Sequence, residues 1–307
     1  MTAETSATVM EAVEYGGWPD CIRLSNREIE LVATTDVGPR IIRLGFLGGQ
    51  NLFHNYPATL GRTGDPEWNN YGGHRLWHAP EVFPRTYAAD NVPVEHSWDG
   101  KSLTLRSTEA RNGIEKETRV TLSATAPRVD VAHRITNRGP WALELAAWTL
   151  SVMASGGRAI YPQEDYKPHP EYLAPARPVV LWHFTDMSDP RWTWGRKYIQ
   201  LRQDPQATTK QKAGLLNSKG WAAYVLGNDV LVKRYPYHPG AAYADMGCNT
   251  DTYTDPEMLE VETLSPLTRL EPGEHIDHDE SWLLARVDCG PSEADIDAHI
   301  LPLLDRL

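Results

Sequence analysis

Two glutamates near the C-terminal end of the sequence stand two residues apart in a pattern typical of a β-strand. In the segment Leu259–Leu264, Glu260 and Glu262 alternate with apolar and β-branched residues, so the two acids share one face of the strand. A turn through Pro272-Gly273 follows and leads into a further strand around Trp282. A carboxylate held on a rigid strand is a candidate general base.

A second group of candidate residues follows a glycine pair: His74, Arg75, Trp77, His78 and Glu81. In an extended strand His74 and His78 share one face, and Arg75 and Trp77 lie on the other. The histidines either hydrogen-bond inside a sheet or move protons at a site. On a helix, His74, His78 and Glu81 would converge on a metal ion, but the preceding glycine pair and the proline at position 80 argue against a helix. We predict no metal site.

A third group lies between these two in the sequence, at the end of a predicted strand and in the loop after it. Lys233, Tyr235 and Asn249 have side chains that can contact sugar hydroxyls or the carboxylate of an acidic sugar. The alternative interpretation is a solvated strand end with no ligand.

Aromatic residues are numerous and unevenly distributed by type: eleven Trp and thirteen Tyr stand beside only four Phe. Flat rings with a polar group pack on the apolar faces of sugars, and Tyr71, Trp77 and Trp148 are candidates for such stacking. A β-rich core that uses the same rings for packing is the alternative, and both interpretations can hold together.

The elements that must position these residues are predicted to be strands almost throughout. Short β-branched runs are separated by turn signals such as Asp99-Gly100 and Asn112-Gly113, and Leu143–Met153 is the most apolar strand. The pattern predicts an all-β, two-sheet sandwich, and residues 1–307 are expected to form a single domain because no linker or change of composition divides them. A short helix is expected to start at Ser292 and to pack on a sheet edge.

Composition excludes some partners. The 307 residues carry 30 basic and 41 acidic side chains, and the net charge of −11 disfavours nucleic acid or an anionic membrane as the main partner. We expect a cytoplasmic protein, because Met1–Met10 has no signal-peptide pattern and no apolar run is long enough to span a bilayer. Three widely spaced cysteines predict neither a disulfide framework nor a zinc site.

Three stretches together resemble the galactose mutarotase-like, or aldose 1-epimerase-like, superfamily, and in particular its DUF4380-type branch. They are Gly38-Pro39-Arg40-Ile41-Ile42, then Gly72-Gly73-His74-Arg75-Leu76-Trp77, and finally Glu262-Thr263-Leu264-Ser265-Pro266. Each motif is short, and the match depends on their order along residues 30 to 285. The resemblance is more specific for the fold than for the reaction.

The resemblance implies a large antiparallel β-supersandwich with a sugar cleft on one concave face. It implies Glu262 as the general base, with Glu260 as the fallback, and His74 as the partner acid or oxygen ligand. Arg75 would bind a substrate hydroxyl or carboxylate. His78, Trp77, Lys233, Tyr235 and Asn249 are the further substrate-binding candidates. The reaction, exchange of sugar anomers through ring opening, requires no cofactor.

One departure from the superfamily pattern concerns the second catalytic histidine. The comparable mid-chain segment, Trp148–Met153, contains no histidine, and His169 and His183 stand in other contexts. Three hypotheses follow: an anomer epimerase, a carbohydrate-binding protein without catalysis, and another sugar-active enzyme such as a uronate lyase. The ligand in each case is a small carbohydrate, and the sequence does not predict the oligomeric state.

Overall fold

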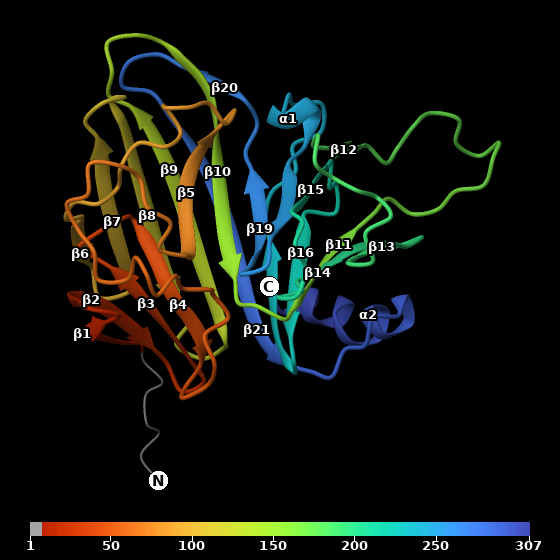
Figure 1. Ribbon diagram of the computed structural model, residues 1–307, viewed down its shortest axis with the longest axis horizontal. Helices are drawn as coiled ribbons and strands as arrows, with labels where there is room; N and C mark the ends of the chain where they lie inside the picture. Colours follow the sequence, from red (N-terminus) through yellow and green to blue (C-terminus); the bar gives the residue numbers. More distant parts are fainter. Residues whose placement is uncertain (1–7) are drawn as a thin grey trace.

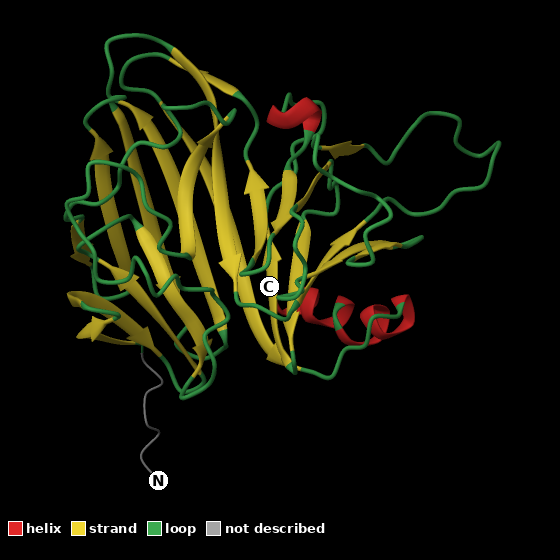
Figure 2. Cartoon of the chain, viewed as in Figure 1, coloured by secondary structure: helices red, strands yellow, loops and turns green. Residues whose placement is uncertain are grey.

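The computed structural model describes residues 8–307, which form two large antiparallel sheets packed face to face (Figures 1 and 2). The 11-stranded sheet has the order β1 (Val9–Tyr15), β2 (Trp18–Ser25), β3 (Ile29–Thr34), β4 (Arg40–Phe46), β5 (Gly73–Ala79), β10 (Leu143–Met153), β19 (Leu259–Leu264), β18 (Thr250–Thr254), β15 (Gln211–Leu215) and β12 (Val179–Leu181), with β20 (Thr268–Leu270) also on β10. The 10-stranded sheet has the order β13 (Trp192–Trp194), β14 (Tyr198–Arg202), β11 (Arg158–Pro162), β16 (Trp221–Leu226), β17 (Asp229–Arg234), β21 (His275–Arg286), β9 (Arg128–Asn137), β8 (Ile114–Leu122), β7 (Ser102–Glu109) and β6 (Glu95–Trp98).

This architecture confirms the predicted all-β sandwich. The apolar segment Leu143–Met153 is a central strand, β10, paired with β5 on one side and β19 on the other. The main apolar core lies between the sheets and takes side chains from both of them, such as Val261 and Leu284. Alternation along each strand therefore decides which side chains enter this core and which lie on the outer face of a sheet.

Helical structure in residues 8–307 is limited to α1 (Ala244–Gly247), α2 (Glu293–His299) and the 3₁₀ helix η1 (Leu301–Arg306). The helix predicted at Ser292 is confirmed: the Ser292 hydroxyl accepts a hydrogen bond from the Asp295 backbone N–H. The expectation that it packs on a sheet edge is wrong. Ile296, Ile300 and Leu303 pack on the outer face of β16, β17 and β21, because that face offers a continuous apolar surface.

Two further expectations can be compared with the structure. Cys21, Cys248 and Cys289 are free, in agreement with the absence of a disulfide framework expected from their spacing, and all three are buried. No helix within residues 8–307 is long and apolar enough to cross a membrane. The segment Met1–Met10, in which we found no signal-peptide pattern, consists mostly of residues 1–7, which lie outside the described residues. The cytoplasmic location stays a prediction.

The register of four neighbouring strands positions the candidate residues. Arg75 on β5 lies opposite Leu150 on β10, Leu150 opposite Glu262 on β19, and Glu262 opposite Asp251 on β18. In the next row, His74 lies opposite Ser151, and Ser151 opposite Val261. Adjacent rows point to opposite faces of a sheet, so the row with Glu262 and the row with His74 face in opposite directions.

Candidate functional site

A pocket of about 410 Å³ lies on the outer face of the 11-stranded sheet, over β5, β10, β19, β18 and β15. We call it the outer-face pocket. Eight of its lining side chains are aromatic: Tyr56, Trp68, Trp77, Tyr87, Trp148, Trp182, Phe184 and Tyr253. The others are Asn70, Arg75, Glu81, Leu150, Lys210, Lys212, Asp255, Met258 and Glu260. An apolar, aromatic wall with a few convergent polar groups is typical of a small-molecule site.

Arg75 and Glu260 form an ion pair in the pocket wall. Arg75 Nη2 donates to Glu260 Oε1 at 3.0 Å, and the guanidinium lies over the rings of Trp77 and Trp68, 4.5 and 5.6 Å from their centroids. The remaining nitrogens, Nε and Nη1, are buried and have no hydrogen-bond partner among residues 8–307. Buried donors without acceptors are costly, so these N–H groups favour an oxygen-rich ligand.

Glu262 lies beneath the floor of the pocket and does not line it. The residue is fully buried, and its Oε2 accepts a hydrogen bond of 2.8 Å from Trp148 Nε1 and lies 3.8 Å from Lys212 Nζ. Burial raises the pKa of Glu262 to about 7, and the ammonium of Lys212 limits that rise. The predicted base therefore has a proton affinity suited to proton transfer near neutral pH, but Trp148 and Lys212 separate it from the pocket.

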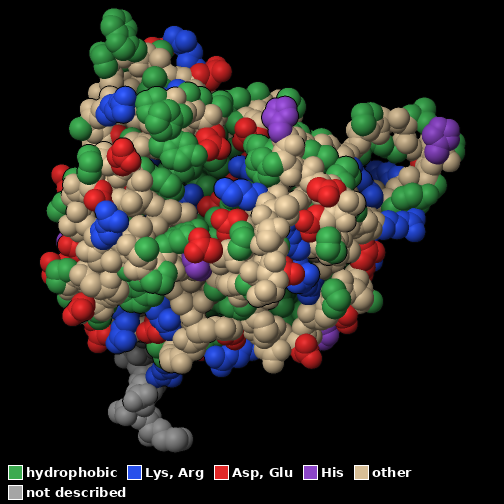
Figure 3. All heavy atoms as spheres, viewed as in Figure 1, with side chains coloured by type: hydrophobic (Ala, Val, Ile, Leu, Met, Phe, Trp, Pro, Cys, Tyr) green, Lys and Arg blue, Asp and Glu red, His purple; other side chains and the backbone are tan. Residues whose placement is uncertain are grey.

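The charges around the pocket are balanced. The lining contains three basic side chains and three acidic ones: Arg75, Lys210 and Lys212, and Glu81, Asp255 and Glu260. Figure 3 likewise shows acidic and basic side chains side by side near the middle of the drawn face. A lining without net charge favours a neutral ligand over an anionic one, such as a uronate.

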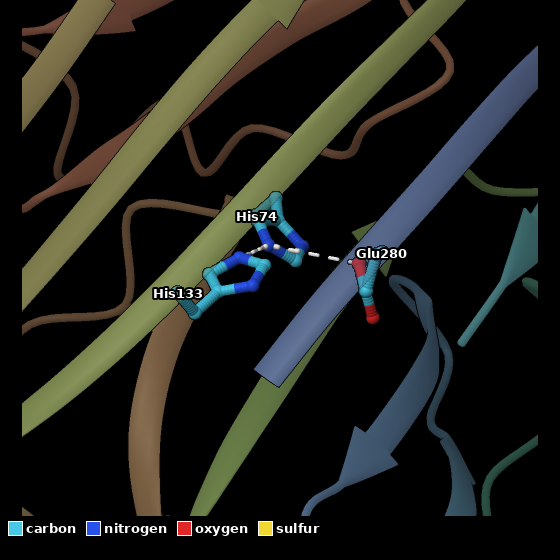
Figure 4. Close-up of side chains that lie close together, drawn as sticks. All are labelled: His74, His133 and Glu280. Carbon is cyan, nitrogen blue, oxygen red and sulfur yellow. Dashed lines mark hydrogen bonds and ion pairs between the residues drawn. The ribbon is translucent and has the colours of Figure 1, made fainter. Parts of the chain in front are cut away.

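His74 lies on the other face of the same sheet, in a polar cluster between the two sheets. We call His74, Ser151, Thr149, Thr263, His133, His278, Lys233 and Glu280 the inter-sheet cluster. Figure 4 shows His74 and His133 directed at one another, with Glu280 beyond them. The expectation that His74 faces Glu262 across one hollow is therefore wrong: alternation along β5 and β10 turns His74 away from the outer face.

Within residues 8–307, the polar groups of the inter-sheet cluster have hydrogen-bond partners, with the exception of His278 Nδ1. His133 Nδ1 must donate to the His278 carbonyl, at 2.8 Å, so its Nε2 accepts from His74 Nε2–H at the same distance. His74 Nδ1 then accepts from the Ser151 hydroxyl. Burial lowers the pKa of both imidazoles, which keeps them neutral.

Glu280 is the one acid of the inter-sheet cluster, and it accepts four hydrogen bonds. Its donors, at 2.7 to 2.9 Å, are Thr149, Thr263, Lys233 and Trp282. Burial acts to raise the pKa of Glu280, but Lys233 and the other neighbouring groups together outweigh it and hold the pKa well below the usual range. His74, His133 and Glu280 are close enough together to hold a metal ion, but their lone pairs already accept hydrogen bonds, and Lys233 supplies the positive charge. The arrangement fits a structural network better than a metal centre.

The structure separates the predicted substrate-binding residues into two sets. Arg75 and Trp77 line the outer-face pocket, whereas the other four are buried elsewhere. His78 lies between the sheets, 3.8 Å from Glu109, and Lys233 pairs with Glu280. Tyr235 hydrogen-bonds Asn217 and Thr250, and Asn249 hydrogen-bonds the Asn217 backbone, so their polar groups already have partners.

The two other stacking candidates also differ. Trp148 lines the pocket, whereas Tyr71 is buried against Trp18 and donates its hydroxyl to Asn91. Tyr71 is therefore a core residue. Both interpretations of the aromatic residues hold, each for different rings.

Sequence reasoning missed Lys212 and Trp182, which line the pocket, and Asp251, which is buried beneath it. Asp251 comes from β18, which pairs with β19, and Lys212 comes from β15, which pairs with β18. Strand order is set by long-range pairing, so nothing in the local pattern associated these residues with Glu260. The one available signal was the alternation in Thr250–Thr254, which places Asp251 and Tyr253 on one face.

A larger cavity of about 640 Å³ lies beside α2 and η1, lined in part by Tyr198, Trp221 and Arg234. It contains none of the predicted site residues, and it lies on the 10-stranded sheet. Cavity volume therefore does not identify the functional site. The unpartnered N–H groups of Arg75 and the acids of β19 favour the outer-face pocket.

Solved structures have a similar fold, and several of them carry mutarotase-related names. The chain matches the Slr1438 protein from Synechocystis sp. PCC 6803 with a TM-score of 0.59, at 13% identity, over 91% of this chain and 100% of the other. It matches a proposed aldose 1-epimerase from Klebsiella pneumoniae subsp. pneumoniae MGH 78578 with a TM-score of 0.63, at 11% identity, over 97% and 87%. A galactose mutarotase-like protein from Lactobacillus casei ATCC 334 gives 0.57, at 11% identity, over 86% and 100%.

These similarities show that the protein has the galactose mutarotase-like fold. No protein-family model and no curated protein matches the sequence. At such low identities the similarity extends to the fold alone, and the function must be argued from the pocket.

Proposed function

We propose that the outer-face pocket binds a neutral monosaccharide and that the protein interconverts the anomers of this sugar, as an aldose 1-epimerase does. The observation that carries the proposal is the Glu260 carboxylate, paired with Arg75 in an aromatic wall of a pocket with balanced charge. The fold and the motif order described above support it, and they also support placing the chain in the DUF4380-type branch.

Glu260 is the base in this proposal, because it lines the pocket and Glu262 does not. Its carboxylate takes the proton of the anomeric hydroxyl, and the bond between C1 and the ring oxygen then breaks. Rotation about C1–C2 and reclosure give the other anomer. Arg75 donates its unused N–H groups to sugar hydroxyls, and Trp77 and Trp148 stack on the sugar ring.

Polarimetry with a panel of neutral aldoses tests the reaction. The wild-type protein should speed the approach to optical-rotation equilibrium, and Glu260→Gln should lower the rate by about 10²- to 10⁴-fold. Glu262→Gln is the matched comparison, since it alters a carboxylate on the same face of the same strand. If Glu262→Gln abolishes the rate and Glu260→Gln does not, Glu262 is the base. No acceleration with any aldose refutes the epimerase.

The lining favours one other function, because no histidine among residues 8–307 lines the pocket and could serve as the acid of an acid–base pair. A carbohydrate-binding protein on this fold would need the aromatic wall and Arg75 but no acid–base pair. Calorimetry separates the two: sugar binding by a protein that accelerates no mutarotation would establish the binding function. Arg75→Met should then weaken binding at least tenfold, because hydrogen bonds from a charged donor contribute about 1.5–3 kcal/mol.

A further inference from the structure

The proposed reaction needs an acid that can protonate the ring oxygen of the sugar. Among residues 8–307 no histidine lines the pocket, and the candidate for this role is Lys212 on β15. Lys212 is 7% exposed and lines the outer-face pocket. Its ammonium lies over the rings of Trp182 and Trp148, 4.6 and 5.1 Å from their centroids. The aromatic faces hold the charge in position at the edge of the space that the ligand would occupy.

The hydrogen-bonding capacity of this ammonium is unused. Within residues 8–307 its one ion-pair partner is Glu262, whose Oε2 lies 3.8 Å from Nζ, beyond hydrogen-bond distance. An ammonium has three N–H donors, and Lys212 lines the pocket, where these donors are open to a ligand. Ligand oxygens in the pocket would supply the missing acceptors.

Two buried carboxyl groups beneath the pocket keep Lys212 charged. Glu262 and Asp251 lie opposite one another on β19 and β18, and both are fully buried. Glu262 Oε1 and both carboxyl oxygens of Asp251 have no hydrogen-bond partner among residues 8–307. Burial acts to lower the pKa of Lys212, but the neighbouring carboxyl groups, Glu262 and Asp251 foremost, together outweigh it and raise the pKa above its ordinary value.

We infer that Lys212 is the electrophilic partner of Glu260: its ammonium hydrogen-bonds the ring oxygen of the sugar and protonates that oxygen when the ring opens. The inference rests on the proposed function. It assigns the role that the sequence analysis gave to His74. Lys212 and Glu260 lie on the same face of the sheet, joined through Tyr253, which pairs with both in the ladder.

Glu260 takes the proton of O1, the C1–O1 bond becomes a carbonyl, and the electron pair of the C1–O5 bond passes to O5. O5 then takes a proton from Lys212, because an alkoxide is a stronger base than an amine. Ring closure returns this proton to Lys212 and the first proton from Glu260 to O1. Preorganised positive charge at a developing alkoxide is among the larger contributions to catalysis.

Lys212→Met tests the inference, since methionine keeps an unbranched stem and removes the charge. We expect kcat for mutarotation to fall by about 10²- to 10³-fold, as when one preorganised donor is removed, with KM changed by a few fold. Lys219→Met, a change at a half-exposed lysine that pairs with Asp165 elsewhere on the protein, is the matched control and should keep the wild-type kcat.

Chemical rescue distinguishes a catalytic ammonium from a structural one. In Lys212→Ala, added ethylammonium should restore part of kcat with saturation, whereas a structural defect would not respond. If Lys212→Met and Lys212→Ala fail to fold, Lys212→Arg decides, because a guanidinium keeps the charge but does not release a proton; its kcat should fall at least tenfold.

The outcomes separate the two proposals. A wild-type enzyme whose kcat survives Lys212→Met or Lys212→Arg overturns the inference alone, and so does a loss that ethylammonium does not restore in a folded Lys212→Ala protein. A wild-type protein that accelerates no aldose overturns the proposed function and this inference with it.

Discussion

Two buried polar clusters lie on opposite faces of β10 and β19, and they differ in how their hydrogen bonds are satisfied. In the inter-sheet cluster, Glu280 accepts four hydrogen bonds and each ring nitrogen of His74 has a partner. Under the outer-face pocket, the opposite holds. Asp251, Glu262, Arg75 and Lys212 leave carboxyl oxygens or N–H groups without hydrogen-bond partners among residues 8–307.

The difference separates a structural role from a functional one. A buried network in which nearly every polar group has a partner stabilises one arrangement of the sheets, and a ligand has little to add to it. A cluster with unused donors and acceptors beside a cavity is stable only at a cost, and that cost is offset when a ligand supplies the missing partners. The sequence pattern indicated His74 as the acid, but Lys212 and Arg75 under the outer-face pocket have the N–H groups that are available to a ligand.

The largest effect is expected from breaking the inter-sheet cluster. Glu280→Gln leaves the ammonium of Lys233 buried without its carboxylate, and we expect the free energy of unfolding to fall by about 3–5 kcal/mol. Urea denaturation followed by tryptophan fluorescence measures the change. Sugar affinity of the protein that remains folded should stay near wild type, since Glu280 faces away from the pocket. A stability within 1 kcal/mol of wild type, on the scale of an ordinary exposed ion pair, would contradict a structural role.

Acid should also weaken the inter-sheet cluster. Burial lowers the pKa of His278 to about 3 from an ordinary 6.5, so between these values the unfolded chain binds a proton that the folded chain does not. The contribution of this group to stability is therefore complete above pH 6.5 and falls by up to about 1.4 kcal/mol per pH unit on acidification. His278→Asn should be less stable at pH 7 but should show a flatter pH dependence in thermal or urea unfolding. An unchanged slope would show that His278 does not titrate in this way.

The fold was predictable because its signals are local. Alternation in segments such as Leu259–Leu264 and the turn residues between strands were sufficient for an all-β sandwich. The same alternation placed Glu260 with Glu262, and Arg75 with Trp77, on shared faces. It also placed His74 on the face opposite to Arg75, which was the one local sign that His74 and Arg75 do not serve the same pocket.

The rest of the site depends on contacts that are distant in the sequence. Lys212 reaches the pocket because β15 pairs with β18 and β18 with β19, a strand order that no local pattern specifies. The burial of Glu262 likewise depends on Trp148, more than a hundred residues away, which donates to its carboxylate. Burial and pairing across strands are properties of the assembled sheet, so the choice between Glu260 and Glu262 required the structure.

Removing the charge of Glu262 beneath the pocket should not lower the free energy of unfolding, whereas removing the charge of Glu280 between the sheets should lower it. The pKa of Glu262 is raised to about 7 from 4.5. Between pH 4.5 and pH 7 the folded chain therefore binds a proton that the unfolded chain has lost, and the free energy of unfolding falls as the pH rises through this range. Glu262→Gln should therefore leave the free energy of unfolding at pH 8 unchanged or raise it by about 1 kcal/mol. Urea denaturation at pH 5 and at pH 8 measures the free energy of unfolding with Glu262 protonated and with Glu262 ionised. A loss of 3 kcal/mol or more, as expected for Glu280→Gln, would remove the contrast between the clusters.

The smallest and most local change concerns the one hydrogen bond that the Glu262 side chain accepts from residues 8–307. Trp148→Phe removes the indole N–H that donates to Glu262 Oε2 at 2.8 Å but keeps an aromatic ring in the pocket wall. The loss should cost about 1 kcal/mol of stability, and the pKa of Glu262 should rise further, because that hydrogen bond favours the ionised form. Carboxyl titration by NMR with labelled glutamate measures the shift, and Trp77→Phe is the matched control, since the Trp77 ring lies in the same wall. An unshifted titration in Trp148→Phe, or an equal shift in Trp77→Phe, would show that general burial and not this hydrogen bond tunes the acid beneath the pocket.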